Sequence, residues 1–343
     1  MVRTAVPPSL AAKVEFLQRP ASYPERPERV EAVETHMSWV FLADGHVYKL
    51  KKPVRYDFLD FSTLAARRRC CEEEVRLNRR LAPDVYLGTV ALKLRPGGGL
   101  GLEGAGEAVD WLVKMRRLPD ARSLPAVIAG GSLRPADLAA LGSLLAAFYR
   151  GCPRADLAPG DYVRRQRADV EANRRELAAP ASGLPEALVA GLDAAQVGFM
   201  ERHADLLESR VRAGWVVEGH GDLRPEHVFL LEAGPVVIDC IEFNRAFRLV
   251  DWADELAYLG LECARLGARA AGEEVLGACC GALGDLPPPE LLRFYAGYRA
   301  CLRAKICLWH AAEPGVVDPE HWRRRAREYL ELAKGYLSAA AEG

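Results

Sequence analysis

The residue pattern of this chain changes near Pro119, and that change limits the folds it can adopt. Up to that point, alternating apolar and polar residues rich in Val, Trp, Tyr and Phe predict strands at 30–54, 85–94 and 109–118. A charged segment at 64–81 lies between the first two strand regions and predicts one helix. The first part of the chain is therefore expected to be a β sheet accompanied by a single helix.

Beyond Pro119 the composition shifts to Ala, Leu and Arg, and apolar residues recur at helical spacing behind Pro135, a suitable first-turn residue. This part is expected to be mostly helical, so the fold class predicted for the whole chain is α+β. We expect two lobes, a small β-rich N-lobe at 1–117 and a larger helical C-lobe at 118–343. Helices are predicted at 138–148, 161–177, 185–212, 252–266 and 291–310, with a last helix that ends near residue 337.

Two glycine-containing segments predict turns instead of a nucleotide-binding P-loop. Asp44 and Gly45 lie between two alternating apolar runs, an arrangement typical of a tight hairpin. The Gly-rich segment 97–106 lacks the GKS or GKT ending that a P-loop needs. It is expected to form a flexible hairpin tip.

Composition and charge exclude several classes of protein. The chain has 343 residues, 50% of them hydrophobic, and can bury a large core, while its net charge of −1 gives no field that attracts nucleic acid or anionic membrane. The nine cysteines form no CxxC pairs, which favours buried reduced thiols over a zinc site or disulfides. No segment resembles a signal peptide or a membrane span. We therefore expect a cytoplasmic protein without nucleic-acid or membrane partners.

Two carboxylates in the segment 215–256 indicate phosphoryl transfer. The sequence His-Gly-Asp that ends at Asp222 lies in a polar loop, and Asp239 follows the apolar run 236–238 at the end of a predicted strand. Transfer from ATP requires one acidic group beside the acceptor hydroxyl and another that holds Mg²⁺ on the phosphates. The pair is therefore consistent with a kinase active site.

Five segments, in order along the chain, resemble the aminoglycoside phosphotransferase family of kinases: THMSWVFL, VYKLKKPV, LNRRLAP, GHGDLRPEHV and IDCIEFN. Together they look most like an uncharacterised bacterial branch of that family, which is sometimes fused to a P-loop domain. The resemblance covers nearly the whole chain and implies a protein-kinase-like, two-lobed fold. It also implies ATP and Mg²⁺ as cofactors, and a hydroxyl of a small molecule, such as a sugar, an amino sugar or a related metabolite, as the acceptor.

The resemblance assigns catalytic roles to three residues. Asp222 matches the family's loop Asp, which accepts or orients the proton of the acceptor hydroxyl. His220 matches a loop His that braces the loop. Arg224 stands where a Lys or His is common, and its guanidinium could clamp the transferring phosphoryl group.

The metal-binding position of the family falls on Asp239, whose carboxylate oxygens suit Mg²⁺. Its usual partner is an Asn, but His227 stands there, and imidazole is a poor ligand for Mg²⁺. His227 could bind through a water, contact a phosphate, or leave the second metal to Glu242. The number of metal ions is therefore left open.

On the nucleotide side, Lys49 resembles the family Lys that holds the α and β phosphates. Lys51 lies on the same face of the predicted strand and is the second choice, because side chains repeat every second residue. Glu74 on the following helix is the expected ion-pair partner of Lys49. The remaining cofactor-binding candidates are Ser38 in the turn above the phosphates, and the main chain of Met115 and Arg117 in the hinge that pairs with adenine.

Two sets of charged residues in the C-lobe are expected to support the site. In the segment DWADELA, one of Asp251, Asp254 and Glu255 is expected to cap or brace the catalytic loop, and Glu255 is the positional match. Arg299 and Arg303 share one face of a late helix. They either line an acceptor pocket, which would suit an acceptor that carries phosphate or carboxylate, or lie on the helix surface with buried stems.

Several other hypotheses compete with a small-molecule kinase. The replacement of Asn by His227 suggests a nucleotide-binding regulatory pseudokinase as the main alternative. A protein kinase is disfavoured because DFG, APE and activation-loop segments are missing. Two metal-hydrolase patterns, the inverzincin and the metallophosphoesterase, are disfavoured because Leu223 breaks HxxEH and no GNH motif accompanies GHGD. The sequence does not name the acceptor, decide between ATP and GTP, or set the oligomeric state.

Overall fold

The computed structural model describes residues 8–313 and 315–341, and the chain divides into two compact units. The first unit runs to Ala126 and takes in a later segment, His227–Ala246. The second contains Val127–Glu226 and the chain from Phe247 onward. Because the predicted lobes are continuous ranges and these units are interleaved, the lobe boundary between residues 117 and 118 stays a prediction.

An antiparallel sheet forms the centre of the first unit, and it confirms all three predicted strand regions. Asp44, with a φ of 49°, and Gly45 make the predicted tight turn between β2 and β3. The Gly-rich segment joins β6 to β8, and part of it pairs with the end of β6 as β7, so a hairpin tip is present there. In spatial order the strands are β1 (Val30–Glu34), β2 (Ser38–Ala43), β3 (His46–Lys51), β8 (Glu107–Arg116), β6 (Tyr86–Leu94) and β7 (Leu100–Gly101).

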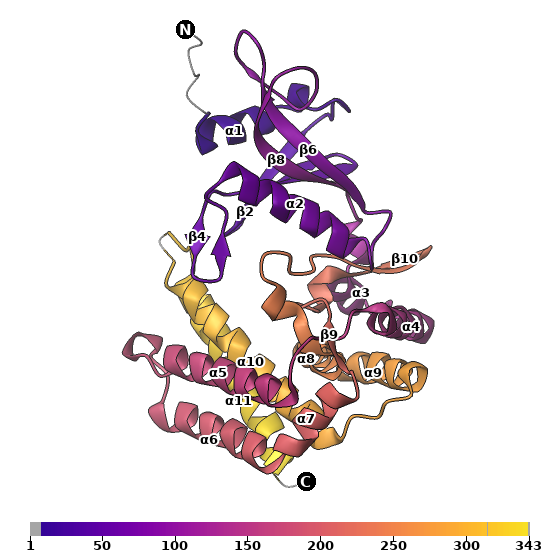
Figure 1. The fold of residues 1–343 in the computed structure, drawn as a ribbon, viewed down its shortest axis with the longest axis vertical. Coiled ribbons are helices and arrows are strands. Elements are labelled where there is room, and N and C mark those ends of the chain that lie inside the picture. The colour runs from indigo at the N-terminus through magenta and orange to yellow at the C-terminus, as the bar shows by residue number, and fades with distance from the viewer. Residues whose placement is uncertain (1–7, 314, 342–343) are drawn as a thin grey trace. The chain divides into compact units, whose positions relative to one another are not determined.

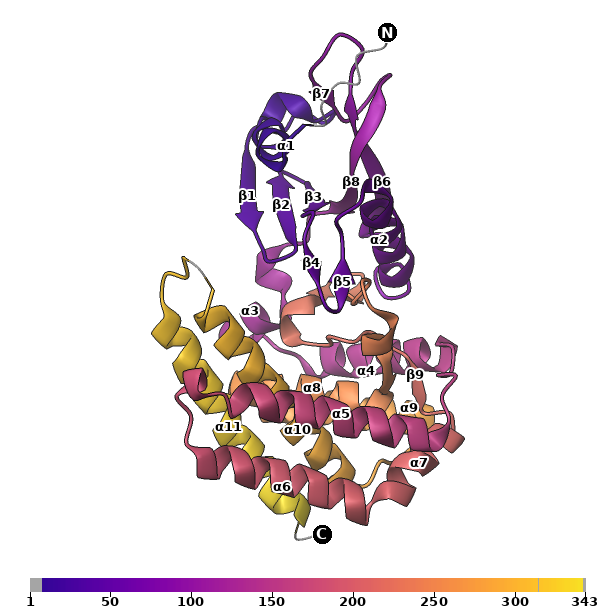
Figure 2. The ribbon, with the colours of Figure 1, turned by 60° about the vertical axis from the view of Figure 1, so that its left-hand side comes forward.

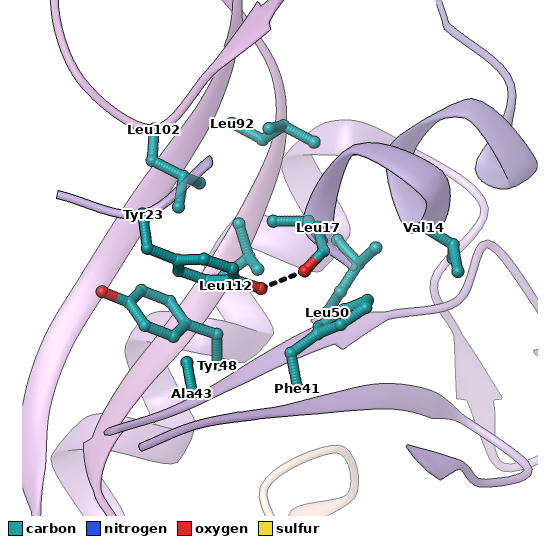
Figure 3. Packing of buried hydrophobic residues seen from close by; sticks show 10 residues of the cluster. All are labelled: Val14, Leu17, Tyr23, Phe41, Ala43, Tyr48, Leu50, Leu92, Leu102 and Leu112. Carbon is teal, nitrogen blue, oxygen red and sulfur yellow. Dashed lines mark hydrogen bonds between the residues drawn. The ribbon is translucent and has the colours of Figure 1, made fainter. Parts of the chain in front are cut away.

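Two helices pack on opposite faces of this sheet. Helix α1 (Leu10–Leu17), which the sequence pattern did not reveal, packs with Phe41, Leu50 and Leu112 in the core drawn in Figure 3. Helix α2 (Leu64–Asn78) lies along β6 and β8 (Figure 2) and packs with Val113 on the other face. Since neighbouring strand residues point to opposite faces, this arrangement turns Lys49 and Lys51 toward α2.

Two short hairpins complete the first unit. Strands β4 (Arg55–Tyr56) and β5 (Leu59–Asp60) lie between β3 and α2 in the chain. Strands β10 (Val228–Leu231) and β11 (Gly234–Val237) form the second hairpin, and its second strand leads directly to Asp239.

The second unit is helical, as predicted. It also contains a two-stranded ribbon of β9 (Val216–Glu218) and β12 (Leu249–Asp251). Helices α10 and α11 lie side by side (Figure 1). The helices are α4 (Pro135–Gly151), α5 (Pro159–Leu177), α6 (Glu186–Arg202), α7 (Ala204–Arg212), α8 (Trp252–Arg265), α9 (Arg269–Leu283), α10 (Pro289–Ala311) and α11 (Pro319–Ala341), with a short α3 (Leu124–Ala129) at the border of the units.

Two helix predictions differ from the structure. The segment 185–212 is not one helix, because His203 leaves the helical region at φ −119° and ψ 29° and its ring stacks on Phe199. Helix α9 was not expected, because its glycines weaken the helical pattern. Its Gly272 packs so closely on Gly260 of α8 that a Cβ atom would lie 2.7 Å from the Gly260 Cα atom.

Eight of the nine cysteines are buried, and Cys152 is partly exposed. The burial of the eight agrees with the prediction that they belong to the core. Among the helices of the described chain, none combines the length and apolar character needed to cross a membrane.

Candidate active site

In the first unit, Lys49 lies between two carboxylates. Its Nζ atom donates to Glu74 Oε1 at 3.0 Å and to Asp239 Oδ1 at 2.8 Å. The expected ion pair between Lys49 and Glu74 is therefore present, and it joins strand β3 to helix α2. Burial alone would lower the pKa of Lys49, but the two carboxylates raise it well above the usual value, so the ammonium stays charged.

The second lysine on this face, Lys51, is more deeply buried. Its Nζ atom donates to Glu74 Oε2 and to Glu242 Oε1. The side chain of Lys51 is 1% exposed, compared with 16% for Lys49. Lys49 is thus the more exposed of the two lysines.

The backbone around Asp239 is held in an uncommon conformation. Asp239 has a φ of 62°, in the left-handed region that side chains other than Gly, Asn and Asp seldom adopt. Its N–H donates to the Tyr86 hydroxyl at 3.1 Å, and the N–H of Cys240 donates to Asn78 Oδ1 at 2.8 Å. Both partners belong to buried parts of the sheet and α2, so they fix the direction of the Asp239 side chain.

Among the candidate metal ligands, the Asp239 carboxylate suits Mg²⁺ better than His227 or Glu242 does. Its side chain is 45% exposed. Burial of the group opposes ionisation, but Lys49 and His227 hold the pKa of Asp239 well below its usual range. His227 Nε2 lies 3.6 Å from Asp239 Oδ2 and is a nitrogen donor that Mg²⁺ disfavours. Glu242 offers oxygen, but that carboxylate is bound to Lys51.

Ser38 is the first residue of β2, directly after the turn from β1, and is 1% exposed. The turn is closed by hydrogen bonds between Ser38 and Thr35, since the Ser38 N–H donates to Thr35 Oγ1 at 3.0 Å and the Thr35 hydroxyl donates to the Ser38 carbonyl at 2.9 Å. A phosphate contact from this turn would therefore have to come from groups other than the buried Ser38 main chain.

The predicted hinge begins at the end of β8. Met115 is inside the strand, and its side chain is buried. The N–H groups of Arg116 and Arg117 donate to the carbonyls of Val85 at 2.8 Å and Gly45 at 2.9 Å. These two donors are used within the sheet, so a base would have to bind other main-chain groups of the segment.

In the second unit, a loop follows strand β9 and carries His220 and Asp222. The buried Glu255 of α8 accepts hydrogen bonds from the N–H groups of His220, at 3.0 Å, and of Gly221. The prediction that Glu255 braces this loop is thus consistent with its contacts. Burial raises the pKa of Glu255, although the two backbone donors favour its ionised form. The ring of His220 is also buried, and its Nδ1 atom accepts from the Asp222 N–H at 3.3 Å.

The Asp222 carboxylate is 28% exposed and accepts hydrogen bonds from the side chains of Arg224 and Tyr258. Arg224 Nε lies 3.0 and 3.1 Å from its two oxygens, and the Tyr258 hydroxyl lies 3.2 Å from Oδ1. Arg224 is therefore beside the candidate base, in contact with its charge. Tyr258 was missed from the sequence, although its position three residues after Glu255 on one helix could have indicated it.

The two arginines of α10 share a face, as predicted, but they are not exposed surface residues. Arg299 is 5% exposed, and its Nε and Nη2 atoms donate to Asp254 at 2.8 and 2.5 Å. Arg303 Nε lies 3.2 Å from Glu262 Oε1. The surface interpretation is wrong because each guanidinium has an internal carboxylate, which makes burial of the charge tolerable.

Comparison with known proteins shows the fold and leaves the family open. No protein-family model matches the chain. Uncharacterised proteins from Mycobacterium bovis and Mycobacterium tuberculosis are each 31% identical over 282 residues, which is 81% of this chain and 54% of theirs. The chain thus spans about half the length of the curated relatives it matches.

Three solved structures share the architecture. A choline/ethanolamine kinase family protein from Mesorhizobium loti aligns with a TM-score of 0.54 at 16% identity, over 97% of this chain and 100% of its own. A choline kinase from Cryptosporidium parvum gives 0.54 at 9%, over 95% and 96%. The GDP complex of aminoglycoside 2'-phosphotransferase-IIIa gives 0.51 at 13%, over 94% and 98%. The chain therefore has the α+β, protein-kinase-like fold that was predicted.

Proposed function

We propose that the chain is an ATP- and Mg²⁺-dependent kinase that transfers the γ-phosphate to a hydroxyl of a small molecule. The observation that carries the proposal is the position of Lys49 between Glu74 and the partly exposed Asp239. An accessible ammonium and a hard carboxylate at adjacent points are the two groups that bind nucleotide phosphates and their metal ion. The similar solved structures are named as a choline/ethanolamine kinase family protein, a choline kinase and an aminoglycoside phosphotransferase, and these names support a small-molecule acceptor.

On the nucleotide side, the residues of this chain would bind and orient the phosphates. Lys49 would donate to phosphate oxygens, and Glu74 would keep its ammonium in place. Asp239 would hold Mg²⁺, which when bound neutralises the charge of the phosphates and fixes their geometry. Burial would raise the pKa of Asp239, but Lys49 more than offsets that effect, so the carboxylate is ionised at neutral pH and can coordinate a metal ion.

On the acceptor side, Asp222 would accept the proton of the acceptor hydroxyl as its oxygen attacks the γ-phosphorus. A new bond forms between that oxygen and phosphorus, the bond from phosphorus to the β–γ bridging oxygen breaks, and ADP leaves. Arg224 and Tyr258 already donate to the Asp222 carboxylate, so they would fix its orientation. Such positioning, with charge stabilisation, supplies most of the catalysis expected for phosphoryl transfer.

The test is transfer of label from γ-labelled ATP, with Mg²⁺, into a pooled library of sugars, amino sugars, nucleosides and amino alcohols. Asp222→Asn keeps the shape of the side chain and should lower turnover by about 10²–10⁴-fold while nucleotide binding is retained. Asp205→Asn removes the same charge from an exposed position in α7 and serves as the control. Full activity of Asp222→Asn would exclude Asp222 as the base.

The same assay separates the alternative function. A wild-type protein that binds ATP but transfers no label to any acceptor class would favour a regulatory pseudokinase. Labelled product formed by the wild type and by the Asp205 variant would instead identify the acceptor class.

A further inference from the structure

Glu242 lies three residues beyond Asp239 and has the hard oxygens that a second Mg²⁺ ion would need. Its carboxylate, however, is 7% exposed, and Oε1 accepts a hydrogen bond from the Lys51 ammonium. The Cys70 thiol also lies 3.4 Å from this oxygen. The Oε1 atom of Glu242 is thus already bound to a buried ammonium.

Lys51 is held in this place from two sides. Glu74 gives one carboxylate oxygen to each lysine, Oε1 to Lys49 and Oε2 to Lys51. The result is an alternating chain of charges, with a carboxylate at each end and one in the middle, in the order Glu242, Lys51, Glu74, Lys49 and Asp239. Burial disfavours the charged form of Lys51, but Glu242 and Glu74 raise its pKa, so the ammonium persists.

The two ends of this row of charges, Asp239 and Glu242, differ in their exposure to solvent. Asp239 is 45% exposed, whereas Glu242 and Lys51 are nearly inaccessible. A metal ion that displaced Lys51 from Glu242 would leave a buried ammonium with one of its two carboxylate partners lost, which is unfavourable in a low-dielectric site. The other neighbour of Asp239 is His227, whose imidazole is a poor Mg²⁺ ligand.

We propose that Lys51 is a positioning residue that takes the place of a second divalent cation at Glu242, so that the nucleotide complex contains one metal ion, held by Asp239. The inference rests on the proposed function, because it concerns the metal ions of the nucleotide complex. In this proposal Glu242 binds the Lys51 ammonium and is not a ligand of a metal ion. Protein kinases, by comparison, hold two Mg²⁺ ions on one ATP.

Counting bound Mn²⁺ by electron paramagnetic resonance, with a non-hydrolysable ATP analogue at saturation, tests this without turnover. The wild type should bind one Mn²⁺ per nucleotide complex. Lys51→Met should open Glu242 and raise the number to two, whereas Lys51→Arg should keep it at one because the charge is retained. Lys52→Met is the matched control, since it removes the same charge from the neighbouring residue, whose ammonium pairs with Glu34.

A second variant keeps the test decisive if Lys51→Met does not fold. Glu242→Gln should leave the affinity for Mn²⁺ unchanged, because Glu242 is not a ligand in the wild type. A fall of about 10–100-fold, the usual effect of losing a group that supports a metal, would overturn the inference. Two Mn²⁺ ions in the wild-type nucleotide complex would also overturn it and leave the proposed kinase function standing. A wild type that binds no nucleotide would overturn both.

Discussion

Replacing Gly219 with alanine should disturb the candidate catalytic loop by displacing Glu255. An added Cβ atom at Gly219 would lie 2.5 Å from Glu255 Oε2 and 3.1 Å from a methyl group of Val250. An ordinary contact requires at least 3.4 Å, so the carboxylate would have to move by about 0.9 Å, the difference between 3.4 and 2.5 Å. The glycine is therefore needed for the close approach of this carboxylate.

The energetic cost follows from the hydrogen bonds that such a movement would weaken. The Glu255 carboxylate accepts from two backbone donors, those of His220 and Gly221. Hydrogen bonds to a charged group contribute about 1.5–3 kcal/mol each, so partial loss of both should lower the free energy of unfolding by about 2–4 kcal/mol. His220 and Gly221 are hydrogen-bonded to the Glu255 carboxylate, so its displacement should also move Asp222, the next residue. A shift of Asp222 of about 1 Å should lower kcat by about 10²-fold.

Denaturant unfolding and steady-state kinetics of the variant would measure the two effects. Gly191→Ala is the matched control, because Gly191 lies on an exposed face of α6 and its added Cβ would meet no atom within 4 Å. The control should be stabilised by up to about 1 kcal/mol, as expected for alanine replacing glycine in a helix. Its kinetic constants should equal those of the wild type.

A double-mutant cycle decides whether Glu255 transmits the effect. Glu255→Gln removes the charge that the loop donors face, so it should act on the same contacts as Gly219→Ala. The double variant should then lose less stability than the two single losses added together. Additive losses, or a Gly219→Ala protein with wild-type stability and kcat, would refute the reasoning.

Two further predictions concern stability. The folded-state pKa of Asp239 is lower than its ordinary value of 3.8, because Lys49 outweighs the effect of burial, so ionised Asp239 stabilises the fold above that pH and the contribution is lost as pH falls. Between about pH 6 and pH 3 the wild type should therefore lose more unfolding free energy than Asp239→Asn, and equal losses in denaturant titrations would contradict this. Arg299→Met leaves the buried Asp254 without its bidentate partner and should cost about 3–5 kcal/mol. Adding Asp254→Leu should recover much of that loss, and an undiminished loss in the double variant would show that the pair is not its source.

Local patterns of the sequence were sufficient to predict several features of the fold and of the candidate site. The alternation along β3 places Lys49 and Lys51 on one face, and the structure has both on the face that meets Glu74. The Asp44-Gly45 turn was also predictable, because few residue pairs adopt its backbone conformation. The pairing of Lys49 with Glu74 needed the family resemblance, since spacing alone does not specify which helix residue meets a strand.

Other features depended on contacts between residues far apart in the chain. Lys51 and Glu242 are separated by 191 positions, and no pattern within either segment indicates that they meet. The helix α9 was hidden because its glycines count against a helix on a propensity scale, although one of them, Gly272, permits close packing against Gly260 of α8. The burial of Arg299 depends on Asp254, a partner that is 45 positions earlier.

The sequence by itself determined the α+β class, the strand faces and the candidate acids Asp222 and Asp239, because periodicity and turn chemistry act over a few residues. Only the tertiary structure decided which of the two lysines is the more exposed, and only the tertiary structure shows that Glu242 pairs with Lys51. The access and partners of a charged side chain depend on how distant segments pack around it, and the cost of burying a charge without a partner then selects the pairs that are found.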